Sequence, residues 1–161
     1  MPETLSPEFV QELYRFLIFI AIVVMIVWAL FANTIRLTLN LIKEENRFLL
    51  PYQAWFLVIP LFNIYWNFEV AKRLSFSLNN EFYDRKIEVE ENPAYRAGMI
   101  YSFAFLAYYI PFPDFFKILT FIVCVVYFIS YWYKINSYRE LIIEHNKWLE
   151  SQDQKQEKHE N

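Results

Sequence analysis

Residues 16–35 read FLIFIAIVVMIVWALFANTI, twenty consecutive residues without a charge. A bilayer core about 30 Å thick is crossed by roughly 20 helical residues, so this segment is long enough to span a membrane. A surface helix of a soluble protein has polar residues along one face, whereas residues 20–31 (IAIVVMIVWALF) have none. The stretch therefore predicts a transmembrane helix.

Three more uncharged runs follow, at residues 48–68, 97–113 and 118–133. Lys117 can extend its charge to the interface while its stem stays in the apolar layer, which lengthens the last run to Phe115. The composition agrees with a membrane protein, because 57% of the residues are hydrophobic, against roughly 45–50% in globular chains. The sequence predicts an all-α fold, a four-helix transmembrane bundle with cytoplasmic helix extensions, with spans at about 16–35, 48–68, 97–113 and 115–133.

The domain organisation predicted from this pattern is simple. Residues 1–150 form one four-span membrane domain, and residues 151–161 (SQDQKQEKHEN) form a polar tail that we expect to be disordered. Ser6 followed by Pro7 predicts the start of the first helix, because serine is a good N-cap and proline suits the first helical position.

The distribution of lysine and arginine predicts the orientation. Four spans place both termini and the middle loop on one side, and that side carries 11 Lys and Arg residues against 4 on the other. The positive-inside rule then predicts a multi-pass protein of the cytoplasmic membrane with both termini in the cytoplasm. One local signal disagrees, because Arg36, Lys43 and Arg47 outweigh Arg15 around the first helix.

The charged and reactive residues predict no enzyme. The spans hold no His, Asp, Glu, Lys or Arg away from their ends, so an intramembrane proton relay or buried metal ligand set is not expected. His145 follows Glu144 directly, so the Glu-x-x-His spacing of di-iron bundles is absent. A single glycine excludes a glycine-rich phosphate loop, and the net charge of −3 disfavours nucleic-acid binding. We expect no cofactor and no metal.

The second run contains a polar segment, IPLFNIYWN, at residues 59–67. Pro60 removes a backbone donor and would kink a helix, and Asn63 and Asn67 lie one turn apart on one face. Asn33 and Asn40 on the first helix are the expected hydrogen-bond partners. Three interpretations stay open: a hydrogen-bonded seam between helices, a polar lining of a cavity or pore, or a subunit interface.

Just after this segment, Glu69 is three and four residues before Lys72 and Arg73. This spacing predicts a cytoplasmic salt bridge on the helix surface.

Trp55, Ile59, Pro60, Asn63 and Trp66 belong to a longer pattern. The pattern approximates W-x3-I-P-x2-N-x2-W-x-F-x-V-x2-R-x-S-x-S, and its remaining residues here are Phe68, Val70, Arg73, Ser75 and Ser77. It covers about 23 residues and resembles a segment of small multi-span bacterial membrane proteins whose function is uncharacterised. The resemblance implies a bacterial inner membrane protein with several helices, and it implies no activity.

Three functions remain after these exclusions, and the least favoured is an enzyme acting on lipid, because no acid–base pair is placed at an interface. The sequence favours a non-enzymatic accessory or scaffolding subunit that contacts the lipid bilayer and binds a larger membrane-protein partner. The alternative is a homo-oligomeric channel or small-solute transporter, formed by self-association, in which Asn63 and Asn67 line the path.

Overall fold

The computed structural model describes residues 6–160, and every regular element in that range is helical. Two short 3₁₀ segments separate the first two long helices. In chain order the elements are α1 (Pro7–Leu41), η1 (Glu44–Asn46), η2 (Pro51–Val58), α2 (Phe62–Asp84), α3 (Tyr95–Tyr108) and α4 (Asp114–Glu160).

The start of α1 agrees with the prediction from Ser6 and Pro7. The Ser6 Oγ accepts a hydrogen bond of 3.3 Å from the backbone N–H of Phe9, and Pro7 is the first helical residue. The hydroxyl satisfies one of the donors left free at a helix N-terminus.

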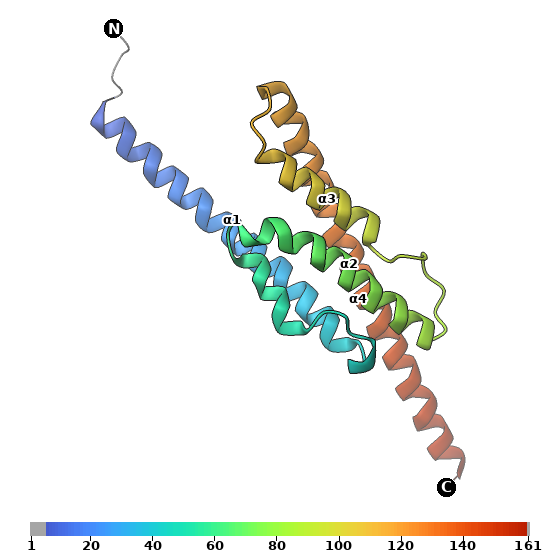
Figure 1. Cartoon of the computed structure of the whole chain (residues 1–161). Helices are drawn as coiled ribbons and strands as arrows, with labels where there is room; N and C mark the ends of the chain where they lie inside the picture. The colour runs from blue at the N-terminus through green and yellow to red at the C-terminus, as the bar shows by residue number, and fades with distance from the viewer. Residues whose placement is uncertain (1–5, 161) are drawn as a thin grey trace.

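The two long helices, α1 and α4, run in the same direction. Phe31 packs on Phe128, and one turn further along both helices the Trp132 indole donates a 3.0 Å hydrogen bond to the Thr34 hydroxyl. As a result, the start of α1 and the end of α4 lie at opposite ends of the elongated molecule (Figure 1).

The shorter helix α3 runs antiparallel to α4. Tyr101 lies against Tyr131, whereas Tyr108, two turns later in α3, lies against Phe121, earlier in α4. A tight connection through residues 109–113 joins the two helices, so α3 and α4 form a helical hairpin.

The structure corrects the second expected span, because residues 48–68 do not form one helix. Segment η2 runs back along the second half of α1, the chain turns at residues 59–61, and α2 then runs in the opposite direction (Figure 1). Pro60 produces the break rather than a kink: a residue before proline avoids the helical region, and Ile59 is extended. Leu61 then adopts a positive φ of 64°, and the Phe62 N–H bonds to the Pro60 carbonyl in a three-residue turn.

The structure also differs from the prediction at the polar tail, because residues 151–160 continue α4 as helix. Gln, Lys and Glu are good helix formers, and this stretch contains neither Gly nor Pro to end the helix. The tail was predicted to be disordered because its composition is of low complexity, but that same composition favours helix. Residue 161 lies outside the described residues.

The buried core occupies only the half of the molecule nearer the end of α4. It is made of the second half of α1, segment η2, α2, the first part of α3 and the middle of α4, with Phe31, Ile35, Leu74, Leu78, Tyr131, Ile135 and Ile142 among its members. The other half consists of apolar helices whose side chains are exposed, including Phe16–Ile20 of α1 and Phe115–Leu119 of α4.

Two helices are long and apolar enough to cross a membrane, α1 and α4. In the most apolar 18-residue window of each, only 11% and 6% of the residues are buried. A core helix of a soluble protein would be mostly buried, so the exposure of these windows favours contact with lipid.

Candidate functional site

The asparagines of the expected polar seam lie inside the protein. Asn63 and Asn67 are 2% and 4% exposed and share one face of α2. Neither residue lines the apolar crevice or the groove of α1 described below. Pro60 lies outside this seam, exposed in the turn that precedes α2.

The expected partners on α1 do not reach the seam. Asn33 is half-buried and Asn40 is exposed, and among the hydrogen bonds of residues 6–160 none joins either one to Asn63 or Asn67. The reason is the packing order, since segment η2 lies against α1 whereas α2 packs on α3.

The seam instead faces α3. The Asn67 amide lies beside the Tyr101 phenol, while the Asn63 Oδ1 is buried without a hydrogen-bond partner. Ser75 Oγ and the Tyr131 hydroxyl are also buried and unpartnered in the same part of the chain. The two asparagines are therefore unequal, because only Asn67 has a polar neighbour placed to pair with it.

We expect this inequality to appear in the stability of leucine variants. Asn67→Leu should lower the free energy of unfolding by about 1–2 kcal/mol, because it leaves the buried Tyr101 hydroxyl unpaired. Asn63→Leu should change it by less than about 1 kcal/mol, because it removes a carbonyl that is already unpaired. Denaturant unfolding in detergent would measure both, and equal losses would contradict this assignment.

The expected ion pair on α2 is present between Glu69 and Arg73. Their Oε2 and Nε atoms are 2.6 Å apart, and the side chains are 22% and 40% exposed. The Arg73 guanidinium also lies over the Trp66 ring, 5.8 Å from its centroid. Lys72 is exposed and takes part in no ion pair of the described residues.

A second ion pair with the same spacing, Glu81–Arg85, is buried. The Glu81 Oε1 accepts a 2.7 Å hydrogen bond from the Arg85 Nε, and the side chains are 0% and 10% exposed. The Glu81 Oε2 accepts two more bonds of 3.0 Å, from the Lys43 backbone N–H and the Asn46 amide. Asn46 also donates to Asp84 at 2.8 Å, so the carboxylates of α2 hold η1 in place.

Arg85 extends this network to the far part of α4. Its Nη1 donates to the Asn146 Oδ1 at 2.6 Å and lies 3.2 Å from the His145 Nδ1. His145 is half-buried against Arg85. We call Asn46, Glu81, Arg85, His145 and Asn146 the clasp. The Glu-x3-Arg spacing was the sequence signal for it, but the same spacing at Glu69 and Arg73 gives an exposed pair.

A third polar cluster surrounds Glu90, in the ten-residue loop between α2 and α3. Its carboxylate accepts hydrogen bonds from Lys134 Nζ (2.8 and 3.1 Å), from the Tyr138 hydroxyl (2.6 Å) and from the Ala94 N–H (3.1 Å). Partial burial alone would raise the pKa of Glu90, but the bonds from Lys134, Tyr138 and Ala94 outweigh it and lower the pKa to about 2. Burial and the bond to Glu90 raise the pKa of Tyr138.

The Glu90 cluster predicts a specific acid sensitivity. A carboxyl whose pKa is lowered on folding stabilises the fold above its unfolded value, here 4.5, and this stabilisation is lost as the pH falls through about 2. The effect should stay below about 1 kcal/mol, because the pair with Lys134 is more than one-third exposed and water screens it. Thermal unfolding between pH 5 and about pH 2 should show a smaller acid-induced loss in Glu90→Gln than in the unsubstituted protein.

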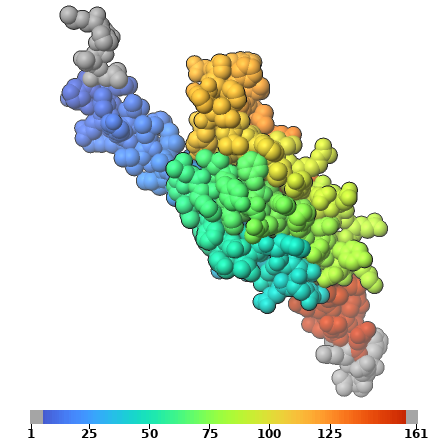
Figure 2. Space-filling model, viewed as in Figure 1, coloured from blue at the N-terminus to red at the C-terminus, as the bar shows by residue number. Residues whose placement is uncertain are grey.

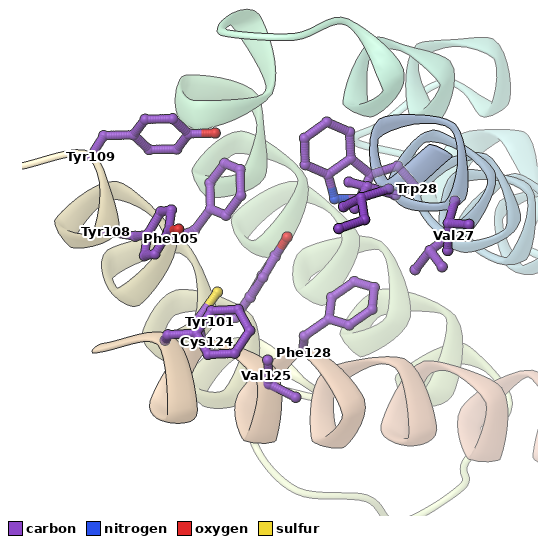
Figure 3. Close-up of a pocket in the computed structure, with 13 residues that line it drawn as sticks. Val27, Trp28, Tyr101, Phe105, Tyr108, Tyr109, Cys124, Val125 and Phe128 are labelled. Carbon is purple, nitrogen blue, oxygen red and sulfur yellow. The ribbon is translucent and has the colours of Figure 1, made fainter. Parts of the chain in front are cut away.

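An apolar crevice opens between α1 and the α3–α4 hairpin, in the half of the molecule that has no packed core. Its volume is about 450 Å³. Figure 2 shows the first half of α1 standing apart from the hairpin across this opening. Figure 3 shows the Tyr101 hydroxyl directed into the space between the rings of Trp28, Phe105 and Phe128. Cys124, the single cysteine of the chain, lies on the α4 wall.

A second, shallower groove lies on another face of α1. Its two small lining residues are Ala21 and Ala29, and Val58 at the end of η2 closes one end of it. The other lining residues are Ile18, Ile22, Met25 and Ile26. Small residues let a neighbouring transmembrane helix approach closely, so this groove has the shape of a helix-packing surface.

Compared with known protein families, with curated proteins and with solved structures, the chain matches none of them. Within residues 6–156 no three His, Cys, Asp or Glu side chains gather as metal ligands would. The polar clusters described above are all explained by contacts that hold the fold together, which leaves the exposed apolar surfaces as the candidate functional site.

Proposed function

We propose that this chain is an integral membrane protein, in a bacterial cytoplasmic membrane, that acts as a non-enzymatic accessory or scaffolding subunit of a larger membrane protein. The observation that carries the proposal is the exposure of the apolar side chains in the first half of α1. Helix α1 is long and apolar enough to cross a bilayer, yet the side chains of its first half are exposed and that half stands apart from the rest of the chain.

The arrangement of the helices supports three crossings rather than four. Helices α1 and α4 run parallel, so the chain must return through the layer between their crossings. Helix α3 has only 14 residues, and together with the connection at residues 109–113 it makes this return. The turn at residues 59–61 enters the apolar layer only partway. Val58, just before the turn, lies against Ala29 of α1. Ala29 is seven residues before the charged Arg36, so the turn lies only about 10 Å into the layer, measured along α1.

The charges support one orientation of this three-crossing arrangement. Of the fifteen lysines and arginines, only Arg15 and Lys117 lie at the end that holds the start of α1 and the α3–α4 turn. The remaining thirteen lie towards the other end. The positive-inside rule therefore favours the start of α1 outside and the end of α4 in the cytoplasm. This orientation also removes the conflict around the first helix, since Arg36, Lys43 and Arg47 are then cytoplasmic.

The partner surface follows from the grooves. A helix of a larger membrane protein would pack on the groove of α1 that contains Ala21 and Ala29. On the cytoplasmic side, α4 continues well beyond Arg85 and the clasp, and this extension offers a second contact. The buried positions of Asn63 and Asn67 give no support to a polar path through a single chain, so the channel alternative requires a homo-oligomer.

The experiment that tests this function is the native mass of the complex after gentle extraction from its own cells, with its subunits identified. Foreign subunits at a fixed stoichiometry are the expected result. Ala21→Trp, which fills the groove, should release them, whereas Val126→Trp on the exposed face of α4 should not. A complex made only of copies of this chain would contradict the accessory role and favour the channel.

A further inference from the structure

We infer that the crevice between α1 and the α3–α4 hairpin binds one acyl chain of an outer-leaflet phospholipid. The inference rests on the proposed membrane function and its orientation. It goes beyond them by naming an occupant for a site that the partner-binding role does not use, since the groove around Ala21 and Ala29 lies on a different face of α1.

The walls of the crevice suit a hydrocarbon chain. Its α1 wall is aliphatic from Ile20 to Val27, with Trp28 at the inner end, and Val125 and Phe128 form part of the α4 wall. The Tyr101 hydroxyl, which enters the crevice, lies beside the Asn67 amide and can pair with it. Because the chain enters from lipid rather than from water, van der Waals contacts with these walls hold it there.

The length and depth of the crevice match one leaflet. The lining of α1 runs from Ile20 to Trp28, about 12 Å along the helix axis. One leaflet contributes about half of the ~30 Å hydrocarbon core. In the proposed orientation Ile20, Val23 and Val24 lie in the outer half of the α1 crossing at residues 16–35, and Val27 and Trp28 lie just past its midpoint. The crevice therefore reaches from the outer leaflet to the bilayer centre, which is the depth of an outer-leaflet chain.

The outer rim of the crevice suits a headgroup. Tyr108 and Tyr109 line it near the α3–α4 turn, and tyrosine favours the headgroup layer. Lys117 is exposed one turn before Phe121, a residue of the α4 wall, and therefore lies on the same face of α4. Its ammonium can contact a lipid phosphate, while Asp114, a further turn out, can contact the amine of a phosphatidylethanolamine.

The experiment is native mass spectrometry of the protein extracted from vesicles of phosphatidylethanolamine and phosphatidylglycerol. Val24→Trp and Val125→Trp fill the crevice from opposite walls, and both positions are exposed enough to accept the larger ring. Leu30→Trp and Val126→Trp add the same ring at exposed positions of the same two helices that line neither the crevice nor the groove around Ala21 and Ala29, and they serve as matched controls.

One tightly retained phospholipid per chain is expected for the unsubstituted protein and for both controls. Its occupancy should fall at least about ten-fold in Val24→Trp and Val125→Trp, because the larger ring takes the space of the chain and removes its packing contacts with the crevice walls. Equal retention in all five proteins would overturn the inference, and so would a lipid-free dimer with the crevice closed by a second copy. Resistance of the protein to alkaline extraction from the vesicles tests the membrane function separately, because it does not depend on the crevice.

Discussion

Glu81→Ala should lower the free energy of unfolding by about 3–5 kcal/mol, the largest loss expected from any single substitution in this chain. The substitution leaves the Arg85 guanidinium, which is 10% exposed, without its carboxylate partner. It also removes the acceptor of the Lys43 N–H and the Asn46 amide. Denaturant unfolding in detergent, followed by circular dichroism, measures the loss.

The chain contains a matched control for this prediction. Glu69 and Arg73 have the same spacing on the same helix, but their side chains are 22% and 40% exposed. Glu69→Ala should therefore cost no more than about 1 kcal/mol. Adding Arg85→Met to Glu81→Ala should recover part of the loss, because it removes the unpaired buried charge. Similar losses for Glu81→Ala and Glu69→Ala would show that the clasp is not a buried, coupled network.

Gly98→Val should be the second most damaging substitution, with a loss of about 3 kcal/mol from overpacking. Gly98 is where α3 passes closest to its neighbours. A Cβ built there would lie 2.8 Å from the Cβ of Ala71 and 2.9 Å from the Tyr131 ring. Neither neighbour can move easily, because Ala71 is fixed to the α2 backbone and Tyr131 is buried in the core.

A compensating substitution tests the geometry of this contact. Ala71→Gly removes the nearest carbon but leaves the Tyr131 ring, so it should restore part of the stability lost in Gly98→Ala, measured as a double-mutant cycle by thermal unfolding in detergent. Ala107→Val, on a half-buried part of the same helix, should cost less than about 1 kcal/mol. If Ala71→Gly and Gly98→Ala destabilise additively, the close approach of α2 and α3 is contradicted.

Local sequence signals predicted several elements of the fold. Ser6 and Pro7 mark the observed start of α1, and the helical spacing of Glu69 and Arg73 is present as an ion pair on α2. These features depend on residues within one or two turns of each other, and local chemistry decides them.

The break in the second run could not be read from hydropathy. A run of 21 uncharged residues has the same composition whether it crosses the bilayer once or turns back halfway. Pro60 was the available signal, but proline is compatible with a kinked spanning helix as well as with a turn. The segment turns because η2 finds a packing surface on α1, a long-range contact that no local pattern encodes.

The candidate site was only partly predictable for a similar reason. The pairs Glu69–Arg73 and Glu81–Arg85 have identical spacing, and only the elements packed against the second pair bury it. The crevice likewise requires residues from α1, α3 and α4, whose parallel and antiparallel order became visible only in the fold.

The sidedness of the two ends of the molecule tests the central proposal most directly. In a Cys124→Ser background, single cysteines at the exposed positions Glu8 and Gln154 would be treated with a membrane-impermeant maleimide on intact spheroplasts. The three-crossing arrangement predicts labelling of Glu8→Cys from outside and of Gln154→Cys only after the membrane is permeabilised. Protection of both cysteines in intact spheroplasts would place both ends in the cytoplasm, as the four-span prediction does. That result would contradict the three-crossing arrangement.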